Sequence, residues 1–393
     1  MDRSMIKKDV KFLAQQGNDK YFSVPKSTSS LAQPDFISFL QYSNLFYAEG
    51  HYTNNGVLVR LLEQRLARFH KTEFCRVFCS GFWAIVLAIK TLAINGKKEI
   101  LMPSLTYRRM ADIAAWLGLK PRFCEVDPQT LAMSEQTVRQ CINSETSLIL
   151  AVHPIINCCD VKGILNLREE YNIPVLFDSV ESVYESTSQG KIGGFGDVEC
   201  FSLHASKLLN GFEGGYITTN NAEIAKKLSA LRNFGFTGQD DVIFSGGMNA
   251  KLNEIHAAMA LANLDNLEKL ISDNKLRYEY YKRRLKEISG VRLVEFDETY
   301  PTSYKNILIE LLDDWPFERD LTVEILNDQN ILARAYYSPP LHKKAMNYPY
   351  IPTELPITDN LAKKFILLPC GDFITCDDIE KIILFLKFLY DRS

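Results

Sequence analysis

A lysine and an aspartate in the middle of the chain have the residue types and spacing that carbonyl chemistry requires. Lys207 follows an apolar stretch at 198–203, which predicts a buried strand, and residues 216–219 predict the next strand. Asp178 ends another apolar stretch that begins at residue 173. A lysine amine can form a Schiff base with a carbonyl group, and a carboxylate can keep a pyridine nitrogen protonated. On spacing alone, a surface lysine and a helix-capping aspartate are the more common explanation.

Several short motifs surround this pair between residue 52 and the C-terminus. They are Thr53-Asn-Asn-Gly56, Ser80-Gly81, Pro103-Ser-Leu-Thr-Tyr107, Asp178, Phe201-Ser-Leu-His-Ala-Ser-Lys207, Glu213-Gly-Gly215, Asn249-Ala-Lys251 and Leu367-Leu-Pro369. In order and spacing this set resembles the DegT/StrS family of pyridoxal-phosphate sugar aminotransferases. That family has the aspartate aminotransferase (fold type I) architecture. One such motif would be weak evidence, whereas this many in order strongly favours the family.

The resemblance implies pyridoxal 5'-phosphate as cofactor, with pyridoxamine phosphate formed during the reaction cycle. Lys207 would hold the cofactor covalently, and Asp178 would pair with the ring nitrogen. The other residues that the resemblance places at the cofactor are Ser80, Gly81, Phe82 and Ser202 at the phosphate, Tyr107 on the ring face, Glu181 near the ring, and Asn249 at the phosphate of the partner subunit. Residues of the expected substrate region are Thr53, Asn54, Lys251, Tyr336 and His342.

Structural alternatives exist for most of these residues. Ser80-Gly81 precedes a predicted helix, whose N-terminal N–H groups and dipole suit a phosphate, but Ser80 can equally be a plain N-cap. The family usually has a small hydroxyl residue in place of Phe82, which can offer only its backbone N–H, so more of the phosphate contact would pass to Ser202. Glu181 follows Asp178 by three residues, and two neighbouring carboxylates repel. We therefore expect Glu181 to have a donor partner or a raised pKa.

Composition fits an ordinary globular protein and argues against several other classes. The 393 residues are 46% hydrophobic and 24% charged, with a net charge of −3, which gives no general reason to expect a nucleic acid or membrane partner. The nine cysteines contain no Cys-x-x-Cys pair, so we expect no zinc or iron–sulfur site and a reducing compartment. The N-terminus lacks a signal-peptide pattern, and the longest apolar run, 82–89, is too short to span a bilayer. A cytoplasmic location follows.

Apolar strands alternate with amphipathic helices from residue 57 to residue 265, which predicts an α/β fold with a mostly parallel sheet covered on both faces. The expected strands are 99–102, 121–126, 148–153, 175–178 and 198–203, and the expected helices include 57–69 and 82–92. A long charged helix at 264–288 would lead to a small α+β domain, with strands at 291–295, 306–312 and 331–337 and helices at 322–327 and 377–390. The expected divisions are an irregular N-terminal arm at 1–42, a large cofactor-binding domain at 43–265 and a small domain at 266–393.

The resemblance implies transfer of an amino group from an amino acid, expected to be glutamate, to a keto-sugar. The motifs containing Lys207 and Asn249 most resemble those of enzymes acting on dTDP-linked 3- or 4-keto-6-deoxy sugars, in deoxyamino-sugar pathways for surface polysaccharides or natural products. A homodimer with shared active sites is implied as well. Two alternatives stay open: a dehydratase of the same fold, although such relatives usually replace the lysine by histidine, and a non-catalytic regulatory or partner-binding paralogue. The sequence does not indicate the sugar, the carbon aminated or the nucleotide.

Overall fold

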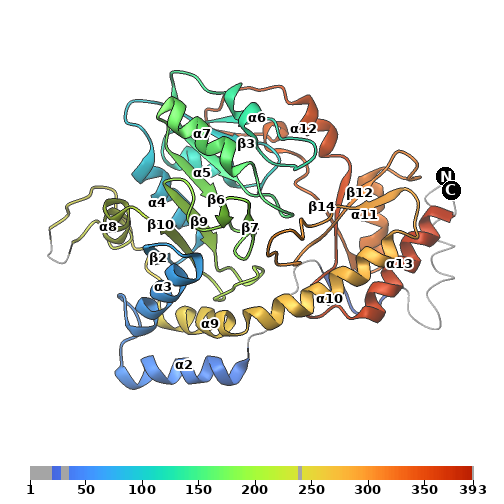
Figure 1. Cartoon of the computed structure of the whole chain (residues 1–393), viewed down its shortest axis with the longest axis horizontal. Coiled ribbons are helices and arrows are strands. Elements are labelled where there is room, and N and C mark those ends of the chain that lie inside the picture. Colours follow the sequence, from blue (N-terminus) through green and yellow to red (C-terminus); the bar gives the residue numbers. More distant parts are fainter. Residues whose placement is uncertain (1–19, 28–34, 238–240, 392–393) are drawn as a thin grey trace.

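The computed structural model describes residues 20–27, 35–237 and 241–391. At its centre is a seven-stranded sheet with the strand order β2-β10-β9-β6-β5-β3-β4 (Figure 1). The strands are β2 (Phe74–Phe78), β3 (Glu99–Pro103), β4 (Lys120–Cys124), β5 (Thr146–Val152), β6 (Val175–Asp178), β9 (Val198–Ser202) and β10 (Gly215–Thr219). Only β10 runs against its neighbours among these strands. The expected mostly parallel sheet is confirmed, although no strand was expected at β2.

Helices cover both faces of this sheet, as the near-continuous apolar strands require. On one face lie α3 (Val57–His70), α6 (Glu135–Arg139), α7 (Val161–Tyr171) and α9 (Glu254–Asp265); on the other lie α4 (Gly81–Leu92), α5 (Met110–Trp116) and α8 (Ala222–Leu231). Consecutive strand residues divide between the two cores. Val77 and Ile149 pack in the first core, whereas Phe78 and Leu150 pack in the second.

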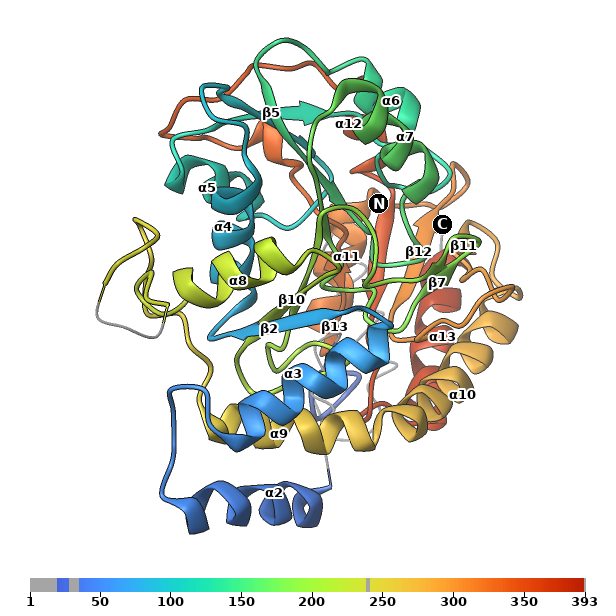
Figure 2. The ribbon, with the colours of Figure 1, turned by 60° about the vertical axis from the view of Figure 1, so that its left-hand side comes forward.

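A second, four-stranded sheet follows in the C-terminal part, with the order β11-β12-β15-β14. Its strands and helices are β11 (Val291–Leu293), β12 (Ile307–Leu311), α11 (Arg319–Asp328), β14 (Arg334–Ala335), β15 (Phe365–Leu368) and α13 (Cys376–Asp391). Helix α10 (Leu267–Leu285) runs from α9 towards this sheet (Figures 1 and 2). It is the long connecting helix that the sequence predicts, but it starts at Leu267, because Asn266 leaves helical geometry between α9 and α10. No strand was expected at β15.

Smaller elements connect these layers. They are β7 (Ser186–Thr187), β8 (Gly190–Lys191), β13 (Ile331–Leu332), the 3-10 turn η1 (Leu341–Lys343) and α12 (Pro356–Leu361). The segment 341–361, which carries η1 and α12, crosses back to the large sheet, where Ile351 donates its N–H to the carbonyl of Pro121. The C-terminal part of the chain therefore contributes residues close to the loops of the large sheet.

The N-terminal arm is more regular than its polar sequence indicates. Helix α2 (Phe36–Glu49) begins at Asp35, whose carboxylate accepts the N–H of Ser38 at 2.9 Å, and it lies alongside α9 (Figures 1 and 2). Strand β1 (Lys26–Ser27) pairs in parallel with β13. The expected irregular structure up to about residue 40 is therefore wrong for these segments, while residues 1–19 and 28–34 lie outside the described part of the chain. Within that part, no helix is both long and apolar enough to cross a membrane.

Candidate active site

The predicted cofactor residues lie on loops that leave one edge of the large sheet. Because β2, β3, β5, β6 and β9 run in the same direction, the segments that follow them emerge together, and ligands of parallel sheets bind at this carboxyl edge. Ser80 follows β2, Tyr107 follows β3, Asp178 ends β6, and Lys207 follows β9. The register pairs Asp178 with Cys200, so the ends of β6 and β9 are adjacent.

Lys207 and Glu181 form a direct ion pair at this edge. The Lys207 Nζ donates a short hydrogen bond to Oε1 of Glu181, and the second oxygen of the same carboxylate lies 3.2 Å from Nζ of Lys305. The three side chains are 18%, 13% and 16% exposed for Lys207, Glu181 and Lys305. Burial raises the pKa of Glu181, but the charges of Lys207 and then of Lys305 outweigh burial and hold it at about 2. The expected donor partner of Glu181 is therefore present, and its pKa is lowered.

Asp178 has a different environment although it is only three residues away. It is 2% exposed, and its carboxylate accepts the N–H of Val180 at 3.2 Å. Burial raises its pKa to about 6, although the Val180 hydrogen bond and the charge of Lys207 act in the opposite direction. A buried carboxylate costs free energy unless it is paired, and a protonated ring nitrogen would supply a charged partner here.

The start of α4 forms a narrow cradle beside the end of β9. Ser80 is the N-cap of α4, since its hydroxyl accepts the N–H of Trp83 at 3.3 Å, and the first N–H groups of a helix have no partner within it. A Cβ atom on Gly81 would lie 3.1 Å from Cβ of Ser202, and one on Gly215 would lie 2.4 Å from the backbone nitrogen of Gly81. A Cβ on Gly215 would clash with this backbone, whereas one on Gly81 would only be tight against Ser202, so the close approach depends on Gly215. It brings helix N–H groups and a serine hydroxyl together, as a phosphate requires.

Tyr107 and the other predicted contact residues lie nearer the surface. Tyr107 is 50% exposed, and Thr53, Asn54 and Asn249 are exposed as well. Lys251 donates to Oδ1 of Asn233 at 3.1 Å. The structure thus brings Lys207, Glu181 and Asp178 together and places Gly81 against Ser202, whereas these more exposed residues keep their expected roles as predictions.

Tyr336 and His342 are both buried in the C-terminal segment. Burial raises the pKa of the Tyr336 hydroxyl, and the charge of Glu181 adds to that effect, which places this tyrosine towards the Glu181 carboxylate. The His342 side chain is 2% exposed; its Nδ1 accepts the hydroxyl of Ser104 at 2.6 Å, and its Nε2 lies 3.1 Å from Asp359. His342 therefore braces the loop that carries Tyr107, and its expected contact with a substrate stays a prediction.

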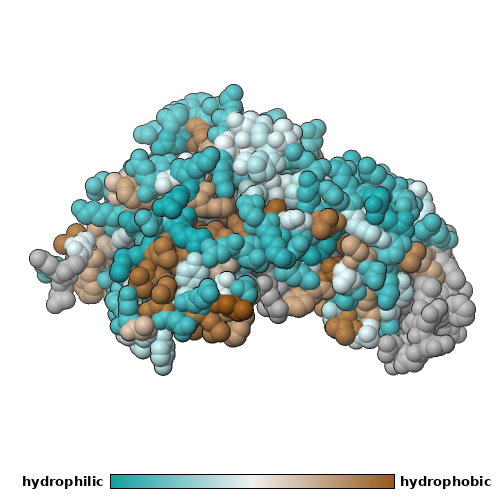
Figure 3. Space-filling model, turned by 60° about the horizontal axis from the view of Figure 1, so that its bottom comes forward, coloured by the Kyte–Doolittle hydropathy of each residue, from teal (hydrophilic) through white to brown (hydrophobic). Residues whose placement is uncertain are grey.

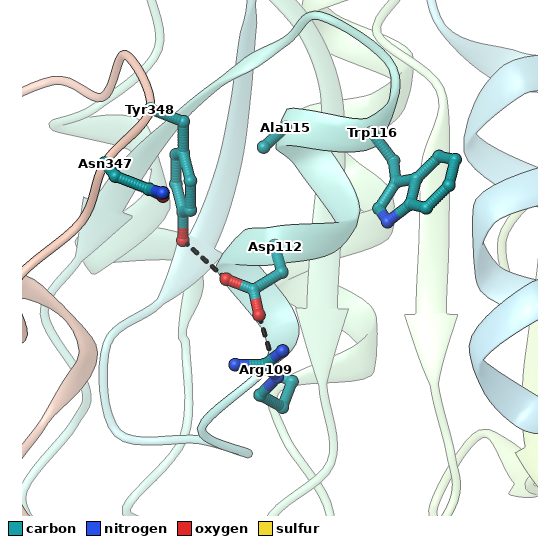
Figure 4. A pocket seen from close by; sticks show the side chains of 6 residues that line it. All are labelled: Arg109, Asp112, Ala115, Trp116, Asn347 and Tyr348. Carbon is teal, nitrogen blue, oxygen red and sulfur yellow. Dashed lines mark hydrogen bonds and ion pairs between the residues drawn. The ribbon is translucent and has the colours of Figure 1, made fainter.

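A pocket of about 490 Å³ opens beside this loop on helix α5 (Figure 4). Its lining residues are Arg109, Asp112, Ala115, Trp116, Asn347 and Tyr348. Asp112 forms an ion pair with Arg109 at 2.8 Å and accepts a hydrogen bond from the hydroxyl of Tyr348 at 3.0 Å. These three polar side chains of the pocket are therefore bonded to one another. Neither Lys207 nor Asp178 lines this pocket, and its lining contains no lysine that could bind a carbonyl group.

A family of known proteins matches most of the chain. Residues 38–387 match the sequence profile described as the DegT/DnrJ/EryC1/StrS aminotransferase family. The chain belongs to this family. It is a pyridoxal-phosphate-dependent aminotransferase, and the expected family, enzyme class and cofactor are confirmed. The predicted fold class is confirmed as well.

Individual relatives are similar over nearly the whole chain. A dTDP-4-amino-4,6-dideoxy-D-glucose transaminase of Shigella dysenteriae is 29% identical over 354 residues, which cover 89% of this chain and 95% of the relative. A GDP-perosamine synthase of Vibrio cholerae is 25% identical over 349 residues, 87% and 93% of the two chains. The crystal structure of DesI in the presence of its TDP-sugar product superposes with a TM-score of 0.89 at 28% identity, covering 98% of this chain and 97% of DesI.

The residues at the edge fit the cofactor of the family. When bound, pyridoxal phosphate supplies an aldehyde for a covalent bond to an amine and a ring that accepts an electron pair. Lys207 is an available amine, Asp178 is a buried carboxylate without a cationic hydrogen-bond donor among the described contacts, and Gly81 at the start of α4 packs closely against Ser202. Sequence reasoning missed Lys305. It stands before β12 as an ordinary lysine, and only the tertiary fold brings it to Glu181.

Proposed function

We propose that this chain transfers an amino group from an amino acid, most simply glutamate, to a keto-sugar linked to a nucleoside diphosphate. The proposal is supported by relatives whose names specify dTDP- and GDP-linked sugars, together with the convergence of Lys207 and Asp178 at one sheet edge. A dTDP-linked 3- or 4-keto-6-deoxy sugar is the preferred substrate within this class. The convergence is the observation that carries the proposal, because it places an amine that could bind the cofactor aldehyde close to a carboxylate that could pair with the ring nitrogen.

In this proposal each residue of the edge has a separate task. Lys207 holds the cofactor and, once released, moves the proton of the donor carbon as a general base and then as an acid. Asp178 keeps the ring nitrogen protonated by a charge-assisted hydrogen bond. Gly81, Phe82 and Ser202 bind the phosphate through backbone N–H groups and a hydroxyl.

The remaining predicted residues complete the proposed site around these groups. Ser80 fixes the start of α4, and Tyr107 covers the ring face from its exposed loop. Thr53, Asn54, Lys251 and Tyr336 would contact the sugar or the donor. Thr53 and Asn54 are exposed, whereas Tyr336 is buried and the charge of Glu181 acts on its hydroxyl.

We also propose a homodimer in which Asn249 reaches the cofactor phosphate of the partner subunit. Asn249 is exposed, and apolar side chains are exposed along α2, α9 and the neighbouring loops (Figure 3). Exposed apolar side chains on α2, on α9 and in the loop at residue 212 are Phe36, Ile37, Leu40, Leu45, Tyr47, Phe212 and Ile255. Exposed apolar surface of this extent is typical of a protein–protein interface.

The chemistry is tested by chemical trapping followed by a substrate screen. Borohydride reduction of the purified holoenzyme and peptide mapping should label Lys207, and Lys207→Ala should abolish transamination while leaving the far-ultraviolet circular dichroism unchanged. The enzyme is then incubated with glutamate and a panel of dTDP-, UDP- and GDP-linked keto-sugars. Release of 2-oxoglutarate with formation of an amino-sugar supports the proposal. Label on another lysine refutes the assignment, and deoxygenation without amination would identify a dehydratase.

The shared site is tested by mixing two inactive variants. Lys207→Ala and Asn249→Ala damage different subunits of one site, so a mixed dimer contains one intact site and should recover part of the activity. Sedimentation measures the assembly at the same dilution. Full activity from a monomer would rule out this part of the proposal.

A further inference from the structure

Two lysines, instead of one, contact the carboxylate of Glu181. Lys207 comes from the loop after β9, and Lys305 comes from the segment before β12 in the second sheet. Each lysine takes a different oxygen of Glu181, and all three side chains are largely buried. Lysine side chains are usually exposed, because burying a charged amine costs free energy unless it is paired.

We propose that Lys305 is a positioning residue that keeps Glu181 charged and in place when Lys207 is engaged by the cofactor. This inference rests on the proposed role of Lys207. A free lysine amine has three N–H donors when protonated, but a nitrogen bonded covalently to the cofactor has at most one. Glu181 can then keep at most one hydrogen bond from Lys207, whereas the Lys305 amine stays free to bond the same carboxylate.

The surroundings of Glu181 make this second cation necessary. The ionisable groups whose charges act on Glu181, or are acted on by it, are Lys207, Lys305, Asp178, Tyr336, Tyr337 and Cys370. Only the two lysines among them bring positive charge. Burial raises the pKa of both tyrosines and of Cys370, so these side chains are neutral at pH 7.

Without Lys305, Glu181 would resemble Asp178 as it stands in this structure. Asp178 is a buried carboxylate that lacks a direct lysine bond, and burial raises its pKa to about 6. Glu181 would then take up a proton near neutral pH when the cofactor binds. A protonated Glu181 no longer attracts the Lys207 amine back after it is released.

The test counts protons taken up on cofactor binding, and does not depend on turnover. Apoprotein is titrated calorimetrically with pyridoxal phosphate at pH 6 and pH 9, in three buffers that differ in ionisation enthalpy and contain neither phosphate nor a primary amine. The slope of heat against buffer enthalpy gives the protons taken up per site. For Lys305→Met we expect at least about half a proton more than for the wild type at pH 6, and less difference at pH 9.

Two further variants identify the group that takes up the proton. Lys305→Arg keeps a cation beside Glu181 and should bind the cofactor with the proton count of the wild type. Lys305→Met/Glu181→Gln lacks the titrating carboxylate and should lose the additional uptake. If Lys305→Met does not fold, Lys305→Gln has nearly the same length and is titrated instead.

Three results distinguish the possible failures. An unchanged proton count in the neutral variants overturns the role of Lys305, and additional uptake that persists in the double variant shows that another group is protonated. In both cases cofactor binding itself is still measured by its absorbance. Absence of binding in the wild type would instead contradict the proposed role of Lys207, so the two inferences fail separately.

Discussion

The substitution Asp178→Asn distinguishes the free-energy cost of burying this carboxylate from its role in the reaction. The pKa of Asp178 is raised from 3.8 to about 6 by burial, so in the apoprotein the folded state favours the protonated form. The stability that this proton provides is present below pH 4 and is lost as the pH rises through 6. The shift of about 2 pKa units corresponds to a penalty of about 3 kcal/mol on the folded apoprotein at pH 8.

Asparagine does not ionise, so the variant escapes this penalty. Its amide oxygen can still accept the N–H of Val180, while its amide hydrogens lack an acceptor and cost about 1–3 kcal/mol at every pH. The informative quantity is therefore the difference in unfolding free energy between variant and wild type as a function of pH. It should move in favour of the variant by about 2.5 kcal/mol between pH 4 and pH 8.

The assay is urea unfolding of the two apoproteins at five pH values, with Asp313→Asn as the control because the Asp313 side chain is fully exposed (102%). In the holoenzyme the same variant should keep the cofactor, through Lys207 and the phosphate contacts. Its single-turnover reaction with excess glutamate should slow at least about a thousandfold, if the carboxylate lowers the barrier by more than about 4 kcal/mol. Asp178→Glu should be damaged too, because one more methylene group displaces the carboxylate. A pH-independent difference in stability would refute the burial penalty, and near wild-type turnover would refute the role of the Asp178 carboxylate in the reaction.

Three other substitutions test how the fold supports this site. Phe22→Ala should lower the unfolding free energy by about 3–5 kcal/mol in urea titrations, because Phe22 is 5% exposed and packs in the core of the second sheet; an unchanged midpoint would show that the N-terminal segment does not contribute. Gly215→Ala should abolish cofactor binding, measured by absorbance near 420 nm, because the added Cβ meets the backbone of Gly81 at 2.4 Å; normal binding would contradict the phosphate cradle. His342→Ala should increase hydrogen exchange at residues 104–110, since it removes the imidazole contact with Ser104 and costs about 1–3 kcal/mol locally. The backbone N–H groups of Leu341 and His342 still bond Ser104, and equal exchange rates would refute the brace.

Local patterns predicted the large sheet well because its strands are apolar on both faces and are separated by amphipathic helices. The strand that ends at Asp178 and the helix that begins near Phe82 were placed within a residue or two. Strand β2 was missed because Phe74–Phe78 contains an arginine in a short segment between two helices. Helix α2 was missed because its exposed apolar residues follow a polar arm, although Pro34 and Asp35 are ordinary helix-start signals.

The candidate site likewise contains residues that the sequence predicts and residues that only the fold brings together. Lys207 and Asp178 were found because each stands at the end of an apolar strand, and the motifs around them are local in sequence. Local sequence motifs could not identify Lys305, because its partner Glu181 is 124 residues away. The ion pair exists only after the second sheet packs against the loops of the first. His342 presents the same difficulty, since its bond to Ser104 joins positions 238 residues apart.

The division of charge between Asp178 and Glu181 gives the strongest physical support for their proposed roles. They are three residues apart and both are largely buried, yet their pKa values are about 6 and about 2. The two lysines account for this contrast, because both bond to Glu181 and neither bonds directly to Asp178. A pair of carboxylates whose environments separate their pKa values has separate tasks. Glu181 is already paired with Lys207 and Lys305. Its carboxylate is therefore suited to hold the Lys207 amine in position. Asp178 still lacks one, and the protonated nitrogen of the cofactor ring is the partner that would restore its charge.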